Sequence, residues 1–287
     1  MPARTVRRLH PALRDDIGDL TTRRPLPGPG LEQLDPFLFL NHHGPQTYKP
    51  NNHGLPFGPH PHRGFETVTF ILEGELAHRD SGGHESIITA GGVQWMTAGS
   101  GLVHAELSPE GFLRRGGPLE ILQLWVNLPA RLKMTAPKYV GLQQGDIPSV
   151  TADEGRVTID AISGDFLGTR GPIGSPTDVQ MAVLRFAPRG FLRLPVAAGR
   201  TIFLYVVRGD MVIGGSAVPE HNLVELNDDG DGVDLGAASE SVVLFGHAPP
   251  LREPMVAHGP FVMNTREEIV QAIRDYQAGK FGGMVAM

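Results

Sequence analysis

Short runs of alternating apolar and polar residues, broken by glycine and proline, dominate the first half of the chain. Segments 65–76, 86–107 and 119–129 are rich in β-branched and aromatic residues, and glycine or proline interrupts or ends each of them. Closely spaced short strands with almost no helical periodicity are typical of a sandwich or a barrel. The pattern therefore predicts an all-β fold.

A second strand-rich block follows the proline-containing segment 129–148, where we expect a domain boundary. The expected domains are an N-terminal one over 1–135 and a C-terminal one over 136–287. The strands of the second block are expected at 157–164, 179–188, 201–215 and 241–246.

The end of the chain has a different periodicity. Apolar residues recur at helical spacing within 265–281, where Thr265 is suited to be an N-cap, Glu268 follows three residues later and Gly279 marks a C-terminal stop. A short C-terminal helix is therefore predicted in the second domain.

The two blocks also show a weak internal sequence repeat. A shift of 135 residues places Gly74 on Gly209, whereas His60 falls on Pro195 and His62 on Ala197. The repeat predicts one fold duplicated, with a second copy that has lost its histidines.

Composition excludes several classes of function. The net charge of −6 argues against direct nucleic-acid binding, and the absence of cysteine excludes disulfides and thiolate chemistry. The N-terminus lacks the apolar core of a secretory signal, and no apolar run approaches the length of a membrane helix. We expect a cytoplasmic protein that has no membrane segment.

Two short motifs carry the candidate chemistry. In PHPHRGFE (59–66), His60 and His62 share one face of an extended strand, and in TAGSGLVHAEL (97–107) His104 and Glu106 do the same. Inward positions of different strands converge in a small barrel, so the pairs can form one metal site. Three imidazoles and a carboxylate suit Fe(II), Mn, Ni or Cu better than structural zinc, and four ligands on an octahedral ion leave two open positions.

The other histidines lack such partners. His42 and His43 are adjacent and point to opposite faces, which favours a loop role. Surface or packing roles are expected for six others, which are His53, His78, His84, His221, His247 and His258. Packing is also the favoured role of four apolar residues near the ligands, with a flat substrate cavity as the alternative: Phe57, Phe65, Trp95 and Met96.

Longer motifs resemble a known family. The two histidine motifs resemble the paired motifs of the cupin superfamily, and together with DPFLFLNHHGP (35–45), LQLWVNLP (122–129) and the closing GPFVMN they resemble the pirin family over most of the chain. The resemblance implies two cupin (jelly-roll type) β-barrels face to face, with a metal only in the N-terminal one.

The same resemblance implies roles for individual residues. It places His60, His62, His104 and Glu106 on the metal, and Glu66 beside it as a hydrogen-bond partner of a ligand imidazole. The parity of Glu66 also suggests the same interior, so the sequence leaves open which glutamate is the carboxylate ligand.

The implied activity is that of a quercetin 2,3-dioxygenase-like oxidoreductase, which cleaves a flavonol or another small aromatic enol with O2. The expected cofactor is Fe(II), with Mn, Ni, Cu or Zn as alternatives, and Glu106 is the candidate base. The alternative is an iron-containing, redox-sensing regulatory protein that acts through a protein partner without substrate turnover.

Overall fold

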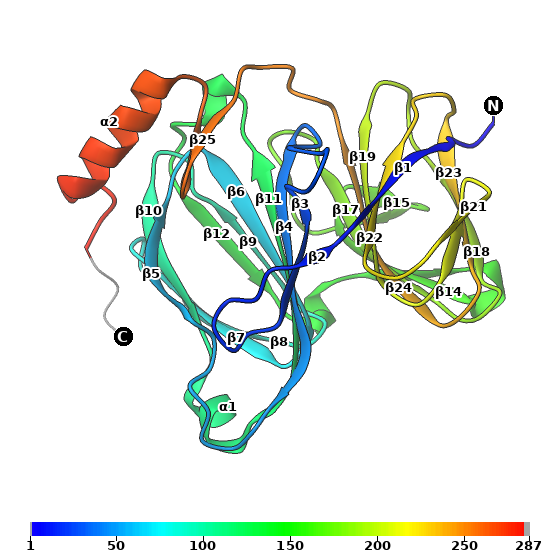
Figure 1. Cartoon of the computed structure of the whole chain (residues 1–287), viewed down its shortest axis with the longest axis horizontal. Coiled ribbons are helices and arrows are strands. Elements are labelled where there is room, and N and C mark those ends of the chain that lie inside the picture. Colours follow the sequence, from blue (N-terminus) through cyan, green and yellow to red (C-terminus); the bar gives the residue numbers. More distant parts are fainter. Residues whose placement is uncertain (1, 284–287) are drawn as a thin grey trace. The chain divides into compact units, whose positions relative to one another are not determined.

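The computed structural model describes residues 2–283, which form two compact units. The first, here called the histidine unit, contains residues 14–23, 37–145 and 251–283. The second, here called the apolar unit, contains residues 2–13, 24–36 and 146–250. Strands dominate both units (Figure 1), which confirms the predicted all-β class.

Two sheets build the histidine unit. In spatial order, the seven strands of the larger sheet are β12 (Lys138–Leu142), β9 (Val93–Thr97), β6 (Phe65–Glu73), β11 (Gly117–Asn127), β4 (Phe37–Tyr48), β3 (Thr22–Leu26) and β2 (Leu13–Arg14). The smaller sheet contains β5 (Phe57–His62), β10 (Leu102–Leu107), β7 (Glu75–Asp80) and β8 (Glu85–Thr89). A side-chain hydrogen bond from Gln123 on β11 to Glu106 on β10 shows that the two sheets enclose a common interior.

The apolar unit has the same plan. Its larger sheet contains β1 (Val6–Pro11), β22 (Asn222–Leu226), β19 (Thr201–Arg208), β24 (Ser241–Ala248), β17 (Gln180–Phe186), β14 (Val157–Ser163) and β13 (Ser149–Ala152). Its smaller sheet contains β18 (Phe191–Pro195), β23 (Gly232–Ala237), β20 (Met211–Ile213) and β21 (Ser216–Val218). Short hairpins complete the chain: β15 (Asp165–Phe166) with β16 (Thr169–Arg170), and β25 (Val256–His258) with β26 (Phe261–Met263).

The internal repeat matches this shared topology. Gly74 follows β6 with φ +85° and Gly209 follows β19 with φ +78°, so both strands end in a turn that favours glycine. The interiors differ. An entirely hydrophobic cluster of buried residues, including Leu194, Leu204 and Val233, joins the two sheets of the apolar unit. Between the sheets of the histidine unit, a hydrophobic cluster that includes Ile71 and Leu76 is accompanied by buried histidine and glutamate.

Helices are few in the described part of the chain. The predicted C-terminal helix is α2 (Arg266–Gln277), and Thr265 and Glu268 form its capping box. A six-residue helix, α1 (Glu110–Arg115), had no counterpart in the sequence analysis. Neither helix is long and apolar enough to cross a membrane.

Two expectations about the architecture differ from the structure. The sheets of each unit do not close into a barrel, because no strand ladder joins the larger sheet to the smaller one among residues 2–283. The two ends of the chain also belong to other units than chain order suggests, because residues 2–13 are part of the apolar unit and residues 251–283 are part of the histidine unit. Strand β1 pairs with β22 at the edge of the apolar unit, and α2 buries Ile269 and Ala272 in a cluster with Val103 of the histidine unit. These contacts are non-local, so a linear boundary at 135/136 could not anticipate them.

Candidate metal site

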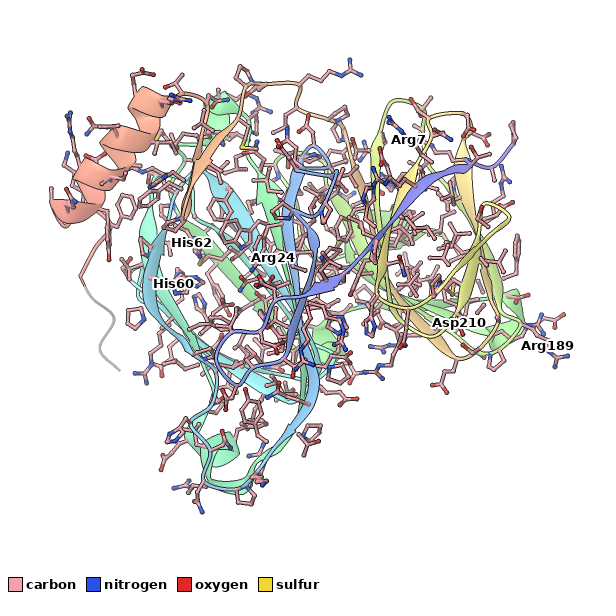
Figure 2. All side chains as sticks on the ribbon, in the orientation of Figure 1. Arg7, Arg24, His60, His62, Arg189 and Asp210 are labelled. Carbon is pink, nitrogen blue, oxygen red and sulfur yellow. The ribbon has the colours of Figure 1, made fainter. Side chains whose placement is uncertain are left out.

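The two predicted histidine pairs lie on neighbouring strands of the smaller sheet. His60 and His62 lie on β5 (Figure 2), and β5 pairs antiparallel with β10 so that His104 is directly opposite His60. One ring nitrogen from each of these histidines lies within 4.8 Å of the others. The three residues, called here the three-histidine group, are the single cluster of this kind within residues 2–283.

The protonation of these rings suits a metal ion. His60 Nδ1 donates a hydrogen bond to the Gly58 carbonyl oxygen at 2.7 Å, so Nε2 is the ring nitrogen left to bind a metal. His62 and His104 are buried, and their ring nitrogens have no hydrogen-bond partner among residues 2–283. Burial lowers the pKa of His62 to about 3 and that of His104 well below its usual value. Buried neutral imidazoles without partners are the donor set that a transition metal requires.

Glu106 lies two residues after His104 in the same interior, but it is not part of the 4.8 Å group. Its carboxylate accepts hydrogen bonds from Thr69 Oγ1 at 3.1 Å, from Gln123 Nε2 at 2.5 Å and from the side-chain amide of Gln94. The structure therefore holds Glu106 beside the histidines by three donors from the opposite sheet.

Those three donors are functional residues that the sequence analysis missed. Gln94 and Gln123 are polar residues with apolar neighbours on both sides, in VQWM and LQLW, and Thr69 lies in FETVTF. A side-chain amide in a buried strand needs a hydrogen-bond partner, so a lone glutamine among apolar residues is the feature of the sequence that marks such a position. The identity of that partner depends on sheet packing.

The expectation for Glu66 is corrected. Phe65 lies against the His62 ring at 5.0 Å between centroids, and Thr69 bonds to Glu106, so odd positions of β6 face the interior. Glu66 has the opposite parity, and its carboxylate accepts a hydrogen bond from Thr97 at 2.6 Å. Burial raises its pKa. The residue therefore lies on the other face of the sheet from the three-histidine group.

Aromatic rings enclose one side of the group. Trp125 lies 5.3 Å from the His62 ring and 4.5 Å from Phe65, between ring centroids. His60 is half-buried, as are its neighbours Pro59 and Pro61 on β5, whereas His62 and His104 are buried. Of the four apolar candidates, Phe57 lines a small cavity together with Glu106 and His43.

Several of the remaining histidines are not surface or loop residues. His42 and His43 are buried within β4, where His42 Nε2 lies 2.9 Å from a Glu120 oxygen and His43 Nδ1 lies 2.9 Å from Thr22 Oγ1. His78 on β7 is fully buried, with its ring centroid 5.5 Å from that of His104. His247, in the apolar unit, is buried and accepts a hydrogen bond from Arg200.

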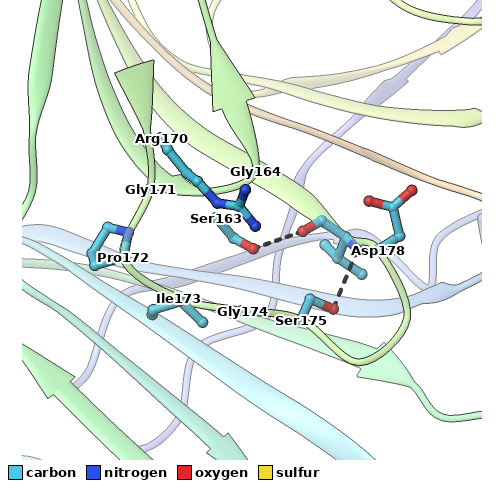
Figure 3. A pocket seen from close by; sticks show the side chains of 10 residues that line it. Ser163, Gly164, Arg170, Gly171, Pro172, Ile173, Gly174, Ser175 and Asp178 are labelled. Atoms are coloured by element: carbon cyan, nitrogen blue, oxygen red, sulfur yellow. Dashed lines mark hydrogen bonds between the residues drawn. The ribbon is translucent and has the colours of Figure 1, made fainter. Parts of the chain in front are cut away.

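A pocket in the apolar unit has a different character (Figure 3). Its lining includes Ser163, Arg170, Asp178 and the glycine-rich segment between them, but no histidine. Ser163 donates to the Val179 carbonyl oxygen at 2.8 Å, so its hydroxyl is already engaged in the fold. This pocket offers no metal-ligating group comparable to the three-histidine group.

The fold and the histidine-lined interior define a protein with two cupin domains. A family model described as Pirin matches residues 19–126, and one described as the Pirin C-terminal cupin domain matches residues 181–282. A pirin-like protein of Caulobacter vibrioides is 41% identical over 93% of this chain and 94% of its own. Human pirin is 39% identical over 91% and 87%, respectively. The chain belongs to the pirin family.

A solved structure supports the same assignment. The crystal structure described as quercetin 2,3-dioxygenase from Acinetobacter baumannii superposes with a TM-score of 0.92 at 33% identity, covering 99% of this chain and all of that one. The resemblance to pirins and the two-cupin fold are thus both confirmed.

Proposed function

We propose that this protein is a metal-dependent dioxygenase of the pirin type, which acts with O2 on a flavonol such as quercetin or on a related aromatic enol. The observation that carries the proposal is the three-histidine group, because the buried ring nitrogens of His62 and His104 have no hydrogen-bond partner within residues 2–283. The Acinetobacter baumannii structure described as a quercetin 2,3-dioxygenase supports the substrate class.

His60, His62 and His104 would hold the ion, and Glu106 is proposed as the fourth ligand or as the base. Fe(II) is the expected metal, with Mn, Ni, Cu or Zn as alternatives for a nitrogen- and oxygen-rich site. A bound divalent metal would supply Lewis acidity toward an enol hydroxyl, together with open positions for two small ligands.

The chain's own residues prepare this chemistry. Gln94 and Gln123 fix the carboxylate of Glu106 within the same interior, where it would receive a proton from a bound hydroxyl. Phe65 and Trp125 cover the His62 ring and keep water from that side. The half-buried His60 marks the side on which a planar substrate would enter.

Oxygen uptake tests the proposal directly. Quercetin is added to iron-loaded protein, oxygen consumption is recorded, and the metal content of the same sample is measured. We expect turnover in the native protein and in the Glu110→Gln control, which changes an exposed carboxylate, but a loss of at least about a hundredfold in Glu106→Gln.

Metal retention tests the ligands separately. His104→Ala should lose the metal, whereas His53→Ala, at an exposed position, should keep it. Full retention in His104→Ala would overturn the ligand assignment. Full iron occupancy without oxygen uptake would instead favour the alternative, a redox-sensing protein that works through a partner.

A further inference from the structure

The interior of the histidine unit contains a fourth imidazole that the proposed function does not use. His78 on β7 is fully buried and lies directly opposite Glu106 in the β7–β10 ladder. Its ring centroid is 5.5 Å from that of His104. The His78 ring therefore borders the same interior space as the side chains of His104 and Glu106.

Asp80 fixes the tautomer of this ring. The backbone N–H groups of Gly82 and His84 donate to Asp80 Oδ1 at 2.8 and 3.1 Å, as expected for an ionised carboxylate that only accepts. Asp80 Oδ2 lies 3.1 Å from His78 Nε2, so the hydrogen of the neutral ring is on Nε2. The lone pair of His78 is consequently on Nδ1.

That lone pair is unpaired in the part of the chain that the structure describes. His78 Nδ1 is buried and has no hydrogen-bond partner there. Tyr139 stacks on the ring at 4.1 Å between centroids and 13° between planes, which prevents the imidazole from rotating away. A buried acceptor left unpaired is unfavourable and calls for a ligand or another function at that position.

We propose that His78 is a positioning residue of the metal site, whose Nδ1 accepts a hydrogen bond from a hydroxyl group of the molecule held at the three-histidine group. It would favour ligands that keep a proton beside the coordinated atom, such as a catechol or enol, over anions that have none. The inference rests on the proposed metal site but not on turnover of quercetin.

Ligand titrations of the iron(III)-loaded protein test this inference. Catechol can donate a hydrogen bond and azide cannot, and both give visible charge-transfer bands with iron(III). In His78→Phe, which keeps a flat ring against Tyr139, we expect unchanged iron content, unchanged azide affinity and about tenfold weaker catechol binding, the effect of one lost hydrogen bond. The matched control is His84→Phe, because exposed His84 also contacts Asp80.

A second variant separates hydrogen bonding from ring packing. His78→Gln carries a carbonyl oxygen that can accept, so catechol affinity should recover at least in part toward the native value. Equal weakening of catechol and azide in both variants, or unchanged catechol binding in His78→Phe, would overturn the role of Nδ1. Iron loss in His78→Phe would also overturn it, since the residue would then support the metal itself. Lack of quercetin turnover affects only the proposed function, because these titrations measure binding.

Discussion

Lys133 is a buried cation that joins three segments of the histidine unit, and its removal gives a quantitative test of the structure. Its side chain is 1% exposed. The ammonium donates to the Gly64 carbonyl oxygen at 2.8 Å, the Val262 carbonyl oxygen at 3.0 Å and Asn127 Oδ1 at 2.6 Å. Gly64 follows His62, the last residue of β5, by two positions, so this cation links the end of β5 to the β25–β26 hairpin.

Two opposing contributions set the expected effect of Lys133→Met. Three hydrogen bonds from a charged donor contribute roughly 1.5–3 kcal/mol each, about 5–9 kcal/mol in all. Burial lowers the pKa of Lys133 from 10.5 to about 8, so holding the charge in the folded state costs about 3 kcal/mol. Methionine fills a similar volume, and the free energy of unfolding should therefore fall by about 2–6 kcal/mol.

Urea denaturation followed by tryptophan fluorescence measures this loss. Both tryptophans of the chain, Trp95 and Trp125, belong to the histidine unit, so the signal reports its unfolding. The control is Lys138→Met, which removes an exposed charge at the start of β12. A Lys133→Met protein as stable as this control would refute the reasoning, because the burial cost would then equal or exceed the hydrogen bonds.

Two further predictions concern the stability lost when Gly64 is replaced and the loss of stability at acidic pH. Gly64 and Gly83 have nearly equal φ values, +89° and +88°, but a Cβ at Gly64 would lie 2.0 Å from the Val262 carbonyl oxygen and one at Gly83 meets nothing within 4 Å. In the same urea assay, Gly64→Ala should therefore lose at least about 2 kcal/mol more than Gly83→Ala, and equal losses would contradict the close approach. In the apolar unit, burial and, to a smaller extent, Arg200 lower the pKa of His247 to about 4. Between pH 6.5 and 4 the folded state therefore binds fewer protons than the unfolded state. About 3 kcal/mol of the free energy of unfolding should be lost over that acidification. Urea titrations by circular dichroism at pH 7 and 4 should show a smaller loss in His247→Gln than in the exposed-site control His258→Gln, and identical losses would exclude this histidine as the cause.

The sequence was most informative where the geometry is local. A two-residue repeat within one strand placed His60 and His62 on one face, and the structure groups both with His104. Parity failed for Glu66 because Gly64, with φ +89°, interrupts the extended chain between β5 and β6. The alternation restarts after that turn, so positions in β6 cannot be counted from β5.

Residues that depend on strand order could not be found in this way. His78 borders the site because β7 pairs with β10, and Gln94 and Gln123 reach Glu106 from the opposite sheet. Neither contact is encoded in local spacing. The family resemblance predicts the fold and the strands that contain the candidate histidines. The assignment of α2 to the second domain rests on chain order alone, whereas α2 packs against the histidine unit.

The same sheet topology serves two purposes in this chain because the interior residues differ. Aliphatic and aromatic side chains join the sheets of the apolar unit, where burial of apolar surface can stabilise the fold. The corresponding space in the histidine unit contains buried polar groups, including ring nitrogens that have no hydrogen-bond partner and therefore oppose folding. A buried hydrophobic cluster that includes Ile71 of β6 and Leu76 of β7 stabilises this unit beside the polar groups. Outside the interior, Lys133 binds the β25–β26 hairpin, and Arg63, next to His62, pairs with Asp275 of α2 at 2.9 Å. The apolar cluster and the contacts of the C-terminal segment thus offset the cost of the buried polar groups around the three-histidine group.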